Sequence, residues 1–580
     1  MNLLIRHRKI VGISLFIILA ILIRFKIILF GLPYSMHADE TYVYKDPLKI
    51  LLLFKDLNFS QPYNLVNWLL AVWTGIIFVI GYIFGQWPDF NTFRDLLLLE
   101  DGKIIFAYRV LSLLASISGN VILYRLCTGI TTNGILKILF ALTFLLNPVE
   151  LLSDNWIKYD AYVFLSFCIL LNYSYSCFFL SREDAVKKLY LFSIIAISVR
   201  IEFISFFISI LLYDGYNNYL TLGRRDFITN IKKKSVYILK GTLVYCIITF
   251  FPVNYIYNYL YPVSANVGIT KPFEKVISSR LMDYFYSGTL FQNITKNFLF
   301  YFNTCFLALG PVIIICIAFF FIKMNRARYL FLFMIFTGAV LLLYGAFGTH
   351  YFLTMSVIFI FGSCVFISQL RNIRLQIIYA LFNLVYVSTV SFSFLAAISF
   401  SRDPRLEAAD YISENISPSD LIAMETHSMN GLGPPLNECK DILLKKSEII
   451  AEIGGGTGET YRLKANNAAG TCWKILDIFS TDYFAGSAYE KTWINTYDKD
   501  LLARGNPEYY ITTRSLQQTK PEGGMLPANS QSIEFYDYIK SNYTLLREFK
   551  CAIFDPRLPY LLNGGLYLRP VRIYKKNKNQ

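Results

Sequence analysis

The sequence predicts a polytopic α-helical membrane protein with about eleven transmembrane helices and a C-terminal extracytoplasmic α/β domain. Hydrophobic residues make up 55% of the 580 residues and charged residues only 16%, whereas average soluble domains carry about 25% charged residues. Long apolar runs recur as far as residue 398, and charges become frequent from Ser399 onward. We therefore expect a transmembrane domain over 1–398 and a soluble domain over 399–580.

The first apolar run, Ile10 to Leu32, has the roughly 20 residues needed to cross a bilayer. Basic residues stand just before it, which predicts a cytoplasmic start. Because the run exceeds the apolar core of a signal peptide and no small-residue cleavage site follows, we expect a retained anchor. The net charge of +15 comes largely from basic clusters in short loops, such as 224–234, 323–328 and 371–374. That pattern indicates cytoplasmic loops of a membrane protein, so nucleic acid is not an expected partner.

The later apolar runs predict the remaining spans, and they leave two topologies open. The runs are 105–127, 134–152, 158–178, 188–213, 236–259, 298–322, 328–348, 350–369 and 374–398. In one topology the stretch 63–85 also spans, and 188–213 crosses once. In the other, 63–85 lies in the interface within a first outer loop over 33–104, and 188–213 forms two short spans broken near Arg200.

The distribution of charged residues favours the second topology. It places the basic loops 182–188 and 214–234 inside, together with the two later basic clusters. One consequence is that seven polar residues fall at span ends on a single outer face. They are Asp39, Glu40, Asp154, Asp160, Arg200, Glu202 and His350.

The region after residue 399 predicts alternating helices and short strands. Helical spacing covers 404–416 with Pro404 in the first turn, and 531–541 is a second predicted helix. Residues 421–424 and 509–512 are predicted strands, so we expect an α/β fold. Three cysteines, Cys439, Cys472 and Cys551, allow one disulfide, and their spacing matches no metal-binding framework. The glycine-rich stretch 454–459 lacks the ending of a phosphate loop and is interpreted as a turn.

Several short motifs, taken in order, resemble those of the GT-C superfamily of integral membrane glycosyltransferases. The nearest likeness is to the branch that contains protein O-mannosyltransferases and the lipid A aminoarabinose transferase. The motifs are Asp39-Glu40 in the first outer loop, Arg109-Val110-Leu111-Ser112 opening a span, Lys158-Tyr159-Asp160 opening a later span, and Arg402-Asp403-Pro404-Arg405 before the soluble domain. The pair His350-Tyr351 departs from the family, where Arg-Tyr is more frequent.

The resemblance implies inverting transfer of a sugar from a polyprenyl-phosphate donor to a glycolipid, polysaccharide or protein acceptor. Asp39 is the expected general base, with Glu40 orienting the acceptor or supporting Asp39. Asp160 is the expected second acid, which assists Asp39 or binds the sugar. The predicted substrate-binding residues are His37, Arg109, Arg200, Glu202, His350 and Tyr351.

Each assignment has a structural alternative. Asp39 suits the N-cap of a helix, and Asp160 suits the first turn of one, where the helix dipole stabilises a negative charge. Arg200 and Glu202 could form an ion pair at the break between half-spans, instead of Arg200 facing a donor phosphate. No cofactor is required, although a divalent metal at His37, Asp39 or Glu40 is compatible with these residue types.

Two functions of other classes compete with glycosyl transfer. A transporter or flippase of lipid-linked sugars is the first, but transporters often show two broken helices in matching positions, and the sequence suggests only one break. A non-catalytic assembly subunit is the second. The expected location is a bacterial inner membrane, with the active site facing the periplasm or the exterior.

Overall fold

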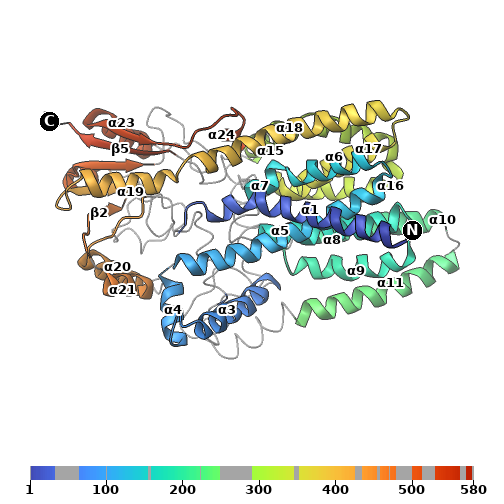
Figure 1. Ribbon diagram of the computed structural model, residues 1–580, viewed down its shortest axis with the longest axis horizontal. Helices are drawn as coiled ribbons and strands as arrows, with labels where there is room; N and C mark the ends of the chain where they lie inside the picture. Colours follow the sequence, from blue (N-terminus) through green and yellow to red (C-terminus); the bar gives the residue numbers. More distant parts are fainter. Residues whose placement is uncertain are drawn as a thin grey trace. The chain divides into compact units, whose positions relative to one another are not determined.

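The computed structural model shows a mostly helical chain (Figure 1). The chain divides into two compact units. It describes residues 2–32, 47, 65–99, 101–153, 159–200, 202–221, 224–247, 290–344, 352–424, 434–452, 458–468, 470–477, 499–512, 530–561 and 570–577. The first unit contains Met1–Phe25, Gln61–Leu70 and Leu111–Phe392. The second unit contains Lys26–Ser60, Ala71–Val110 and Ser393–Gln580.

The helices before residue 401 carry the apolar character that the sequence predicts. They are α1 (Asn2–Leu29), α3 (Leu65–Ile83), α4 (Phe90–Leu98), α5 (Gly102–Ile130), α6 (Gly134–Leu145), α7 (Pro148–Ser153), α8 (Asp160–Phe178), α9 (Glu183–Ile197), α10 (Phe203–Thr221), α11 (Arg224–Tyr245), α15 (Leu290–Leu309), α16 (Pro311–Tyr344), α17 (Leu353–Ser368) and α18 (Ile373–Phe400).

Six stretches of the described chain are long and apolar enough to cross a membrane, or seven if one bent pair counts as a span. They are Ile10–Leu29, Leu65–Ile83, Gly102–Ile130, Gly134–Ser153, Asp160–Phe178 and Ile373–Asn415. The helical membrane class is therefore confirmed, whereas the expected count of about eleven is not reached. Among the described residues, one predicted run is divided at Gly310, and another forms α17, which is shorter than a bilayer is thick. Parts of the predicted runs 236–259, 328–348 and 350–369 lie outside the described residues.

The run 188–213 is also divided. Helix α9 ends at Ile197 and α10 begins at Phe203, so the predicted break near Arg200 is present. The predicted loop over 214–234, in contrast, is wrong, because α10 continues to Thr221 and α11 begins at Arg224. Asp214 in α10 accepts hydrogen bonds from Tyr190 of α9 (2.5 Å) and from Lys234 of α11. These two hydrogen bonds stabilise the carboxylate of Asp214, so α10 can continue past this charged residue.

A second break divides the run 298–322. Helices α15 and α16 meet at Gly310 with a bend of 103°. Gly310 has φ of 34°, and a Cβ atom there would lie 2.5 Å from the ring of Tyr386. Because α16 then continues from Pro311 to Tyr344, the basic residues 323–328 lie within a helix and not in the predicted loop. Those residues include good helix formers and neither glycine nor proline.

The stretch 63–85 contains α3, which has 19 residues and is long enough to span. Helix α4 follows it and is N-capped by Asp89, whose carboxylate accepts a hydrogen bond from the backbone N–H of Thr92 at 2.8 Å. One face of α4 buries Phe93 and Leu97. Within the second unit, α4 contacts a helix of the C-terminal α/β region, α21 (Gly458–Asn467).

The C-terminal part of the second unit has the predicted α/β fold. Its further elements are α19 (Pro404–Asn415), β1 (Leu421–Met424), α20 (Lys440–Glu452), β2 (Lys474–Asp477), α22 (Lys499–Gly505), β3 (Tyr509–Thr512), α23 (Ser530–Asn542), β4 (Tyr543–Phe549), α24 (Leu558–Leu561) and β5 (Val571–Lys576). The sheet order is β2-β1-β3-β5-β4, with β1 parallel to β2 and β3, and β5 antiparallel to β3 and β4.

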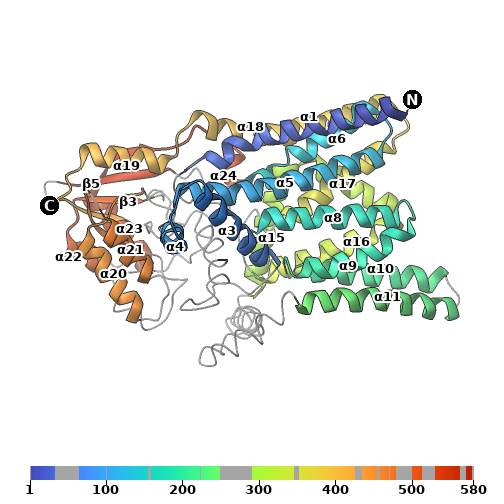
Figure 2. The same cartoon turned by 60° about the horizontal axis from the view of Figure 1, so that its bottom comes forward.

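Both faces of this sheet are covered (Figure 2). Helix α19 packs Ala408 and Ile412 against one face, beside Ile422 and Ile573. Helices α22 and α23 pack Leu502 and Phe535 against the other face. Strands β1 and β3, which have the predicted bounds 421–424 and 509–512, bury almost all of their side chains, as expected for short apolar strands covered on both faces. Strand β4 exposes most of its side chains and lacks that apolar run, so it was not predicted from the sequence.

A disulfide joins Cys439 to Cys472, with the two Cα atoms 4.9 Å apart, so one of the pairings that the sequence allows in this region is present. The bond links the residue just before α20 to the residue just before Trp473. Trp473 itself forms a parallel β-bridge with Glu438, the neighbour of Cys439. The thiol of Cys551 is buried. Burial raises its pKa to about 12.

Candidate functional site

The candidate site is built around Asp160, the first residue of α8. Its side chain is only 5% exposed, which makes an ionised carboxylate costly unless it has a partner. The preceding residue, Tyr159, donates a hydrogen bond from its hydroxyl to the side-chain oxygen of Asn67 in α3, at 2.7 Å. The start of α8 and the start of α3 are therefore joined directly beside the acid.

Arg200 supplies the partner of Asp160. Its Nη1 atom lies 3.2 Å from Oδ1 of Asp160, and its Nε atom lies 3.1 Å from Oε1 of Glu202. Arg200 and Glu202 both occupy the break between α9 and α10, and each side chain is 19% exposed. The guanidinium group therefore bridges the carboxylate at the start of α8 and the carboxylate in the break between α9 and α10.

A backbone contact brings α3 to the same place. The N–H of Leu65, at the start of α3, donates to the carbonyl of Ser198 at 2.8 Å. Ser198 is the residue that ends α9. The helix break therefore exposes a carbonyl that would otherwise be bonded inside a helix, and α3 uses it.

The three charged groups have a formal net charge of −1, because one guanidinium faces two carboxylates. Carboxylates accept hydrogen bonds, and ionised acceptors make the stronger ones. A group rich in hydroxyl donors therefore matches this cluster better than a second anion does. Arg200 and Glu202 are both partly exposed, so the cluster is not completely enclosed by the protein.

Three of the predicted site residues are thus brought together: Asp160, Arg200 and Glu202. The structural alternative for Arg200 and Glu202, an ion pair at the helix break, is present, with Asp160 as an additional partner. Asp160 also lies at a helix start, as its own alternative requires. The other predicted residues Asp39, Glu40, His37, Asp154, His350 and Tyr351 lie outside the described residues.

Arg109 is placed differently, because its guanidinium is used to terminate a helix. The side chain is fully buried, and Nη1 donates to the carbonyl oxygens of Ile28 (3.0 Å) and Phe30 (2.9 Å) at the end of α1. Cationic groups at a helix C-terminus satisfy free carbonyls and interact favourably with the helix dipole. These contacts show a structural task for Arg109, and its predicted role in substrate binding stays a prediction.

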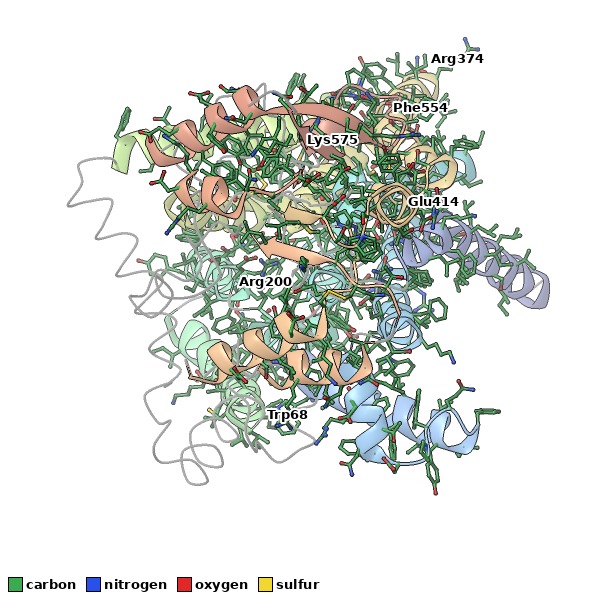
Figure 3. All side chains as sticks on the ribbon, turned by 90° about the vertical axis from the view of Figure 1, so that its left-hand side faces the viewer. Trp68, Arg200, Arg374, Glu414, Phe554 and Lys575 are labelled. Atoms are coloured by element: carbon green, nitrogen blue, oxygen red, sulfur yellow. A yellow bond between two sulfur atoms is a disulfide. The ribbon has the colours of Figure 1, made fainter. Side chains whose placement is uncertain are left out.

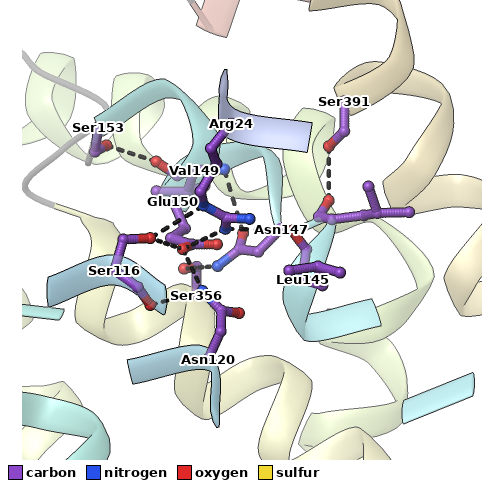
Figure 4. A network of polar contacts seen from close by, with 11 residues as sticks. Arg24, Ser116, Asn120, Leu145, Asn147, Val149, Glu150, Ser153, Ser356 and Ser391 are labelled. Atoms are coloured by element: carbon purple, nitrogen blue, oxygen red, sulfur yellow. Dashed lines mark hydrogen bonds and ion pairs between the residues drawn. The ribbon is translucent and has the colours of Figure 1, made fainter. Parts of the chain in front are cut away.

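A second charged cluster, which the sequence reasoning missed, lies in the first unit (Figure 4). Arg24 of α1 places Nη2 2.5 Å from Oε1 of Glu150 in α7, and both side chains are fully buried. The same carboxylate oxygen accepts hydrogen bonds from Ser116 (2.9 Å) and Asn120 (2.7 Å) of α5. Ser116 also accepts a hydrogen bond from Nε of Arg24.

The short helix α7 is held by further contacts on its N-terminal side. Asn147 donates to the hydroxyl of Ser356 in α17 at 2.8 Å, and Ser391 of α18 donates to the carbonyl of Leu146 at 2.6 Å. The sequence feature that pointed to this charged cluster was a charge inside each of two apolar runs, namely Arg24 in 10–32 and Glu150 in 134–152. Their pairing across 126 positions depends on helix packing, so the sequence alone did not show it.

Among the residues that the structure describes, no group of three or more His, Cys, Asp or Glu side chains could hold a metal ion. His37, Asp39 and Glu40, for which a metal was considered, lie outside that part of the chain.

A scan against protein-family models finds no match to the chain. A search of curated proteins likewise finds no significant match.

Proposed function

We propose that the protein is an integral membrane glycosyltransferase that moves a sugar from a polyprenyl-phosphate donor to an extracytoplasmic acceptor. The acceptor class comprises glycolipids, polysaccharides and proteins. The observation that carries the proposal is the cluster of Asp160, Arg200 and Glu202, which joins three helix ends at a partly exposed position. The resemblance of the short motifs to the GT-C superfamily supports the same conclusion.

The proposed reaction proceeds with inversion at the anomeric carbon. The acceptor hydroxyl oxygen attacks that carbon while its proton passes to the carboxylate of Asp39, and Glu40 supports Asp39 or orients the acceptor. The bond from the anomeric carbon to the lipid phosphate breaks, and the phosphate leaves with the electron pair. Positive charge near the departing phosphate would stabilise the transition state.

Within this proposal, Asp160 accepts hydrogen bonds from sugar hydroxyls or supports Asp39, and Arg200 holds Asp160 in place. The contacts of Arg200 with two carboxylates favour this division of roles, because they already match its charge. A direct contact between Arg200 and the donor phosphate would require the guanidinium to leave one of these carboxylates.

The test measures sugar transfer and release of lipid phosphate by the purified full-length protein, across a panel of polyprenyl-phosphate sugars. We expect Asp39→Asn to lower turnover by about 10²-fold or more, since it removes a general base and keeps the size of the side chain. Asp184→Asn is a matched control, because Asp184 is a 74% exposed acid on α9, far from a helix break. Normal turnover by Asp39→Asn would contradict the assignment of the base.

One observation favours a second candidate, a transporter or flippase of lipid-linked sugars. Among the described residues, α15 and α16 form one bent pair, which breaks at Gly310 with an angle of 103°. Discontinuous helices are frequent in transporters, where they form the binding site. In liposomes, a flippase would translocate a labelled lipid-linked sugar without any acceptor and independently of Asp39. Wild type that translocates the lipid and reacts with no donor would favour this candidate.

A further inference from the structure

The segment 551–557 of the soluble domain returns along the end of α18. The N–H of Ala552 donates to the hydroxyl of Ser401 at 3.0 Å, and the N–H of Asp555 donates to the hydroxyl of Ser393 at 2.8 Å. Since Ser393 and Ser401 are eight positions apart, the segment follows the helix for about 12 Å, antiparallel to it. The sulfur of Cys551 adds a contact to the carbonyl of Arg402 at 3.8 Å.

Two chain segments meet at this junction, and each contains the same four-residue motif. Asp403-Pro404-Arg405-Leu406 leads out of α18, and Asp555-Pro556-Arg557-Leu558 ends the returning segment. In each motif the aspartate accepts the backbone N–H of the arginine at 2.9 Å, and the arginine Nη2 lies 2.6 Å from the second carboxylate oxygen. In each motif the aspartate and the arginine therefore form an ion pair whose two charges compensate each other.

Between the two serine contacts, the returning segment exposes large apolar side chains. Phe554, which Figure 3 labels, is 64% exposed. Ile553 is exposed as well, and Phe400 at the end of α18 is 81% exposed. Exposed large apolar side chains on both segments of this junction indicate an interaction surface.

The exposed face of α18 continues into this apolar region. Its exposed large residues Phe382, Val385, Phe392 and Phe400 recur at intervals of three, seven and eight positions, which places them on one side of the helix. Ser393 and Ser401 each directly follow one of these phenylalanines, so they lie about 100° around the helix from it. The returning segment therefore borders the apolar face.

The length of α18 indicates at which depth of the membrane the returning segment lies. The helix has 28 residues and is thus about 42 Å long, whereas the hydrocarbon core is about 30 Å thick. Arg374 stands at its first turn. Counting about 20 residues from that end puts the far boundary of the core near Phe392, so Ser393 to Ser401 lie in the interfacial layer. Aromatic side chains concentrate in that layer.

We propose that residues 551–557 form a membrane anchor of the soluble domain, with Ile553 and Phe554 inserted into the interface of the phospholipid bilayer beside α18. The occupant of this surface is lipid and not a protein partner, because the surface is continuous with the apolar face of a spanning helix. The anchor fixes the start of the soluble domain at the bilayer surface by a second attachment, in addition to the chain connection through α18.

The test places the photo-crosslinking residue p-benzoylphenylalanine at position 554 of the full-length protein in phospholipid membranes. Ultraviolet irradiation followed by mass spectrometry should reveal phospholipid adducts at position 554, as at Phe392 on the apolar face of α18. Leu546 on β4 is the matched control, because it is an exposed apolar residue of the soluble domain outside the segment. It should form no lipid adduct.

Two results would overturn the proposal. One is the absence of lipid adducts at position 554 while position 392 forms them, and the other is equal labelling at positions 554 and 546. The readout does not depend on folding of a destabilised variant, since Phe554 is largely exposed and an aromatic replaces an aromatic. It is also independent of enzymatic activity, so the proposal stands or fails apart from the proposed function.

Discussion

Two clusters in the first unit each join an arginine to carboxylates, and they differ in burial. Arg24 and Glu150 are fully buried, and their contacts with Ser116 and Asn120 tie together α1, α5 and α7. Arg200 contacts two carboxylates at a helix break, where it is 19% exposed. The Arg24 cluster is therefore closed to solvent, whereas the Arg200 cluster, made of the same chemical groups, is partly accessible.

This difference in burial leads us to expect different effects when the two clusters are changed. A buried pair that is broken leaves a charge without compensation in a medium of low dielectric constant, which is strongly destabilising. A partly exposed cluster can exchange contacts with water or a ligand at much lower cost. We therefore expect changes in the first cluster to act on folding, and changes in the second cluster to act on turnover.

The largest expected effect is that of Glu150→Ala. The change leaves Arg24 buried without its carboxylate, and we expect the free energy of unfolding to fall by about 3–5 kcal/mol. The measurement is chemical or thermal unfolding of the purified protein in detergent. The double change of Arg24→Met and Glu150→Leu is the control, because replacing both partners by apolar residues is often neutral. Wild-type stability of Glu150→Ala would show that the pair contributes nothing.

Asp160→Asn is expected to change the free energy of unfolding less than Glu150→Ala does, and to act mainly on turnover. Arg200 keeps its contact with Glu202, so we expect the unfolding free energy to change by about 1 kcal/mol or less. Turnover should fall by about 10²-fold, which is in the range for loss of an acid or base that acts in the reaction. Measuring both quantities on one preparation makes the comparison sharp. A loss of stability as large as that of Glu150→Ala would assign Asp160 to the structural class.

The smallest effect concerns a third arginine–carboxylate pair, Asp555 and Arg557 in the soluble domain, whose side chains are exposed to an extent similar to Arg200. Hydrogen bonds from the Arg557 side chain are the main cause that lowers the pKa of Asp555. A lowered pKa in the folded state means that the stabilisation is complete above the unfolded value of about 3.9 and disappears as the pH falls through the folded value.

Asp555→Asn should therefore lower the unfolding free energy by up to about 1 kcal/mol at pH 7, as is usual for pairs near the surface. The difference from wild type should vanish in acid, below the folded pKa of Asp555. Melting temperatures of both proteins across the acidic pH range provide the measurement. A difference that persists unchanged in acid would mean that the carboxylate charge is not the stabilising feature.

Much of the fold was predictable because it depends on local patterns. The apolar runs predicted α1, α5, α8 and α18, and Pro404 predicted the start of α19. The break near Arg200 was predictable because two charges interrupt an apolar run. The bend at Gly310 was missed, since the flanking residues are apolar on both sides and the bend requires the close approach of Tyr386.

By itself, the sequence determined that this is a helical membrane protein with an α/β domain, and it identified Asp160, Arg200 and Glu202 as unusual charges. Only the tertiary structure decided that these three residues meet, that Arg109 closes the end of α1, and that Arg24 binds Glu150. The physical reason is one of range. Hydropathy and helix signals act within about 20 residues, whereas the pairing of charges 40 or 126 positions apart depends on how the helices pack.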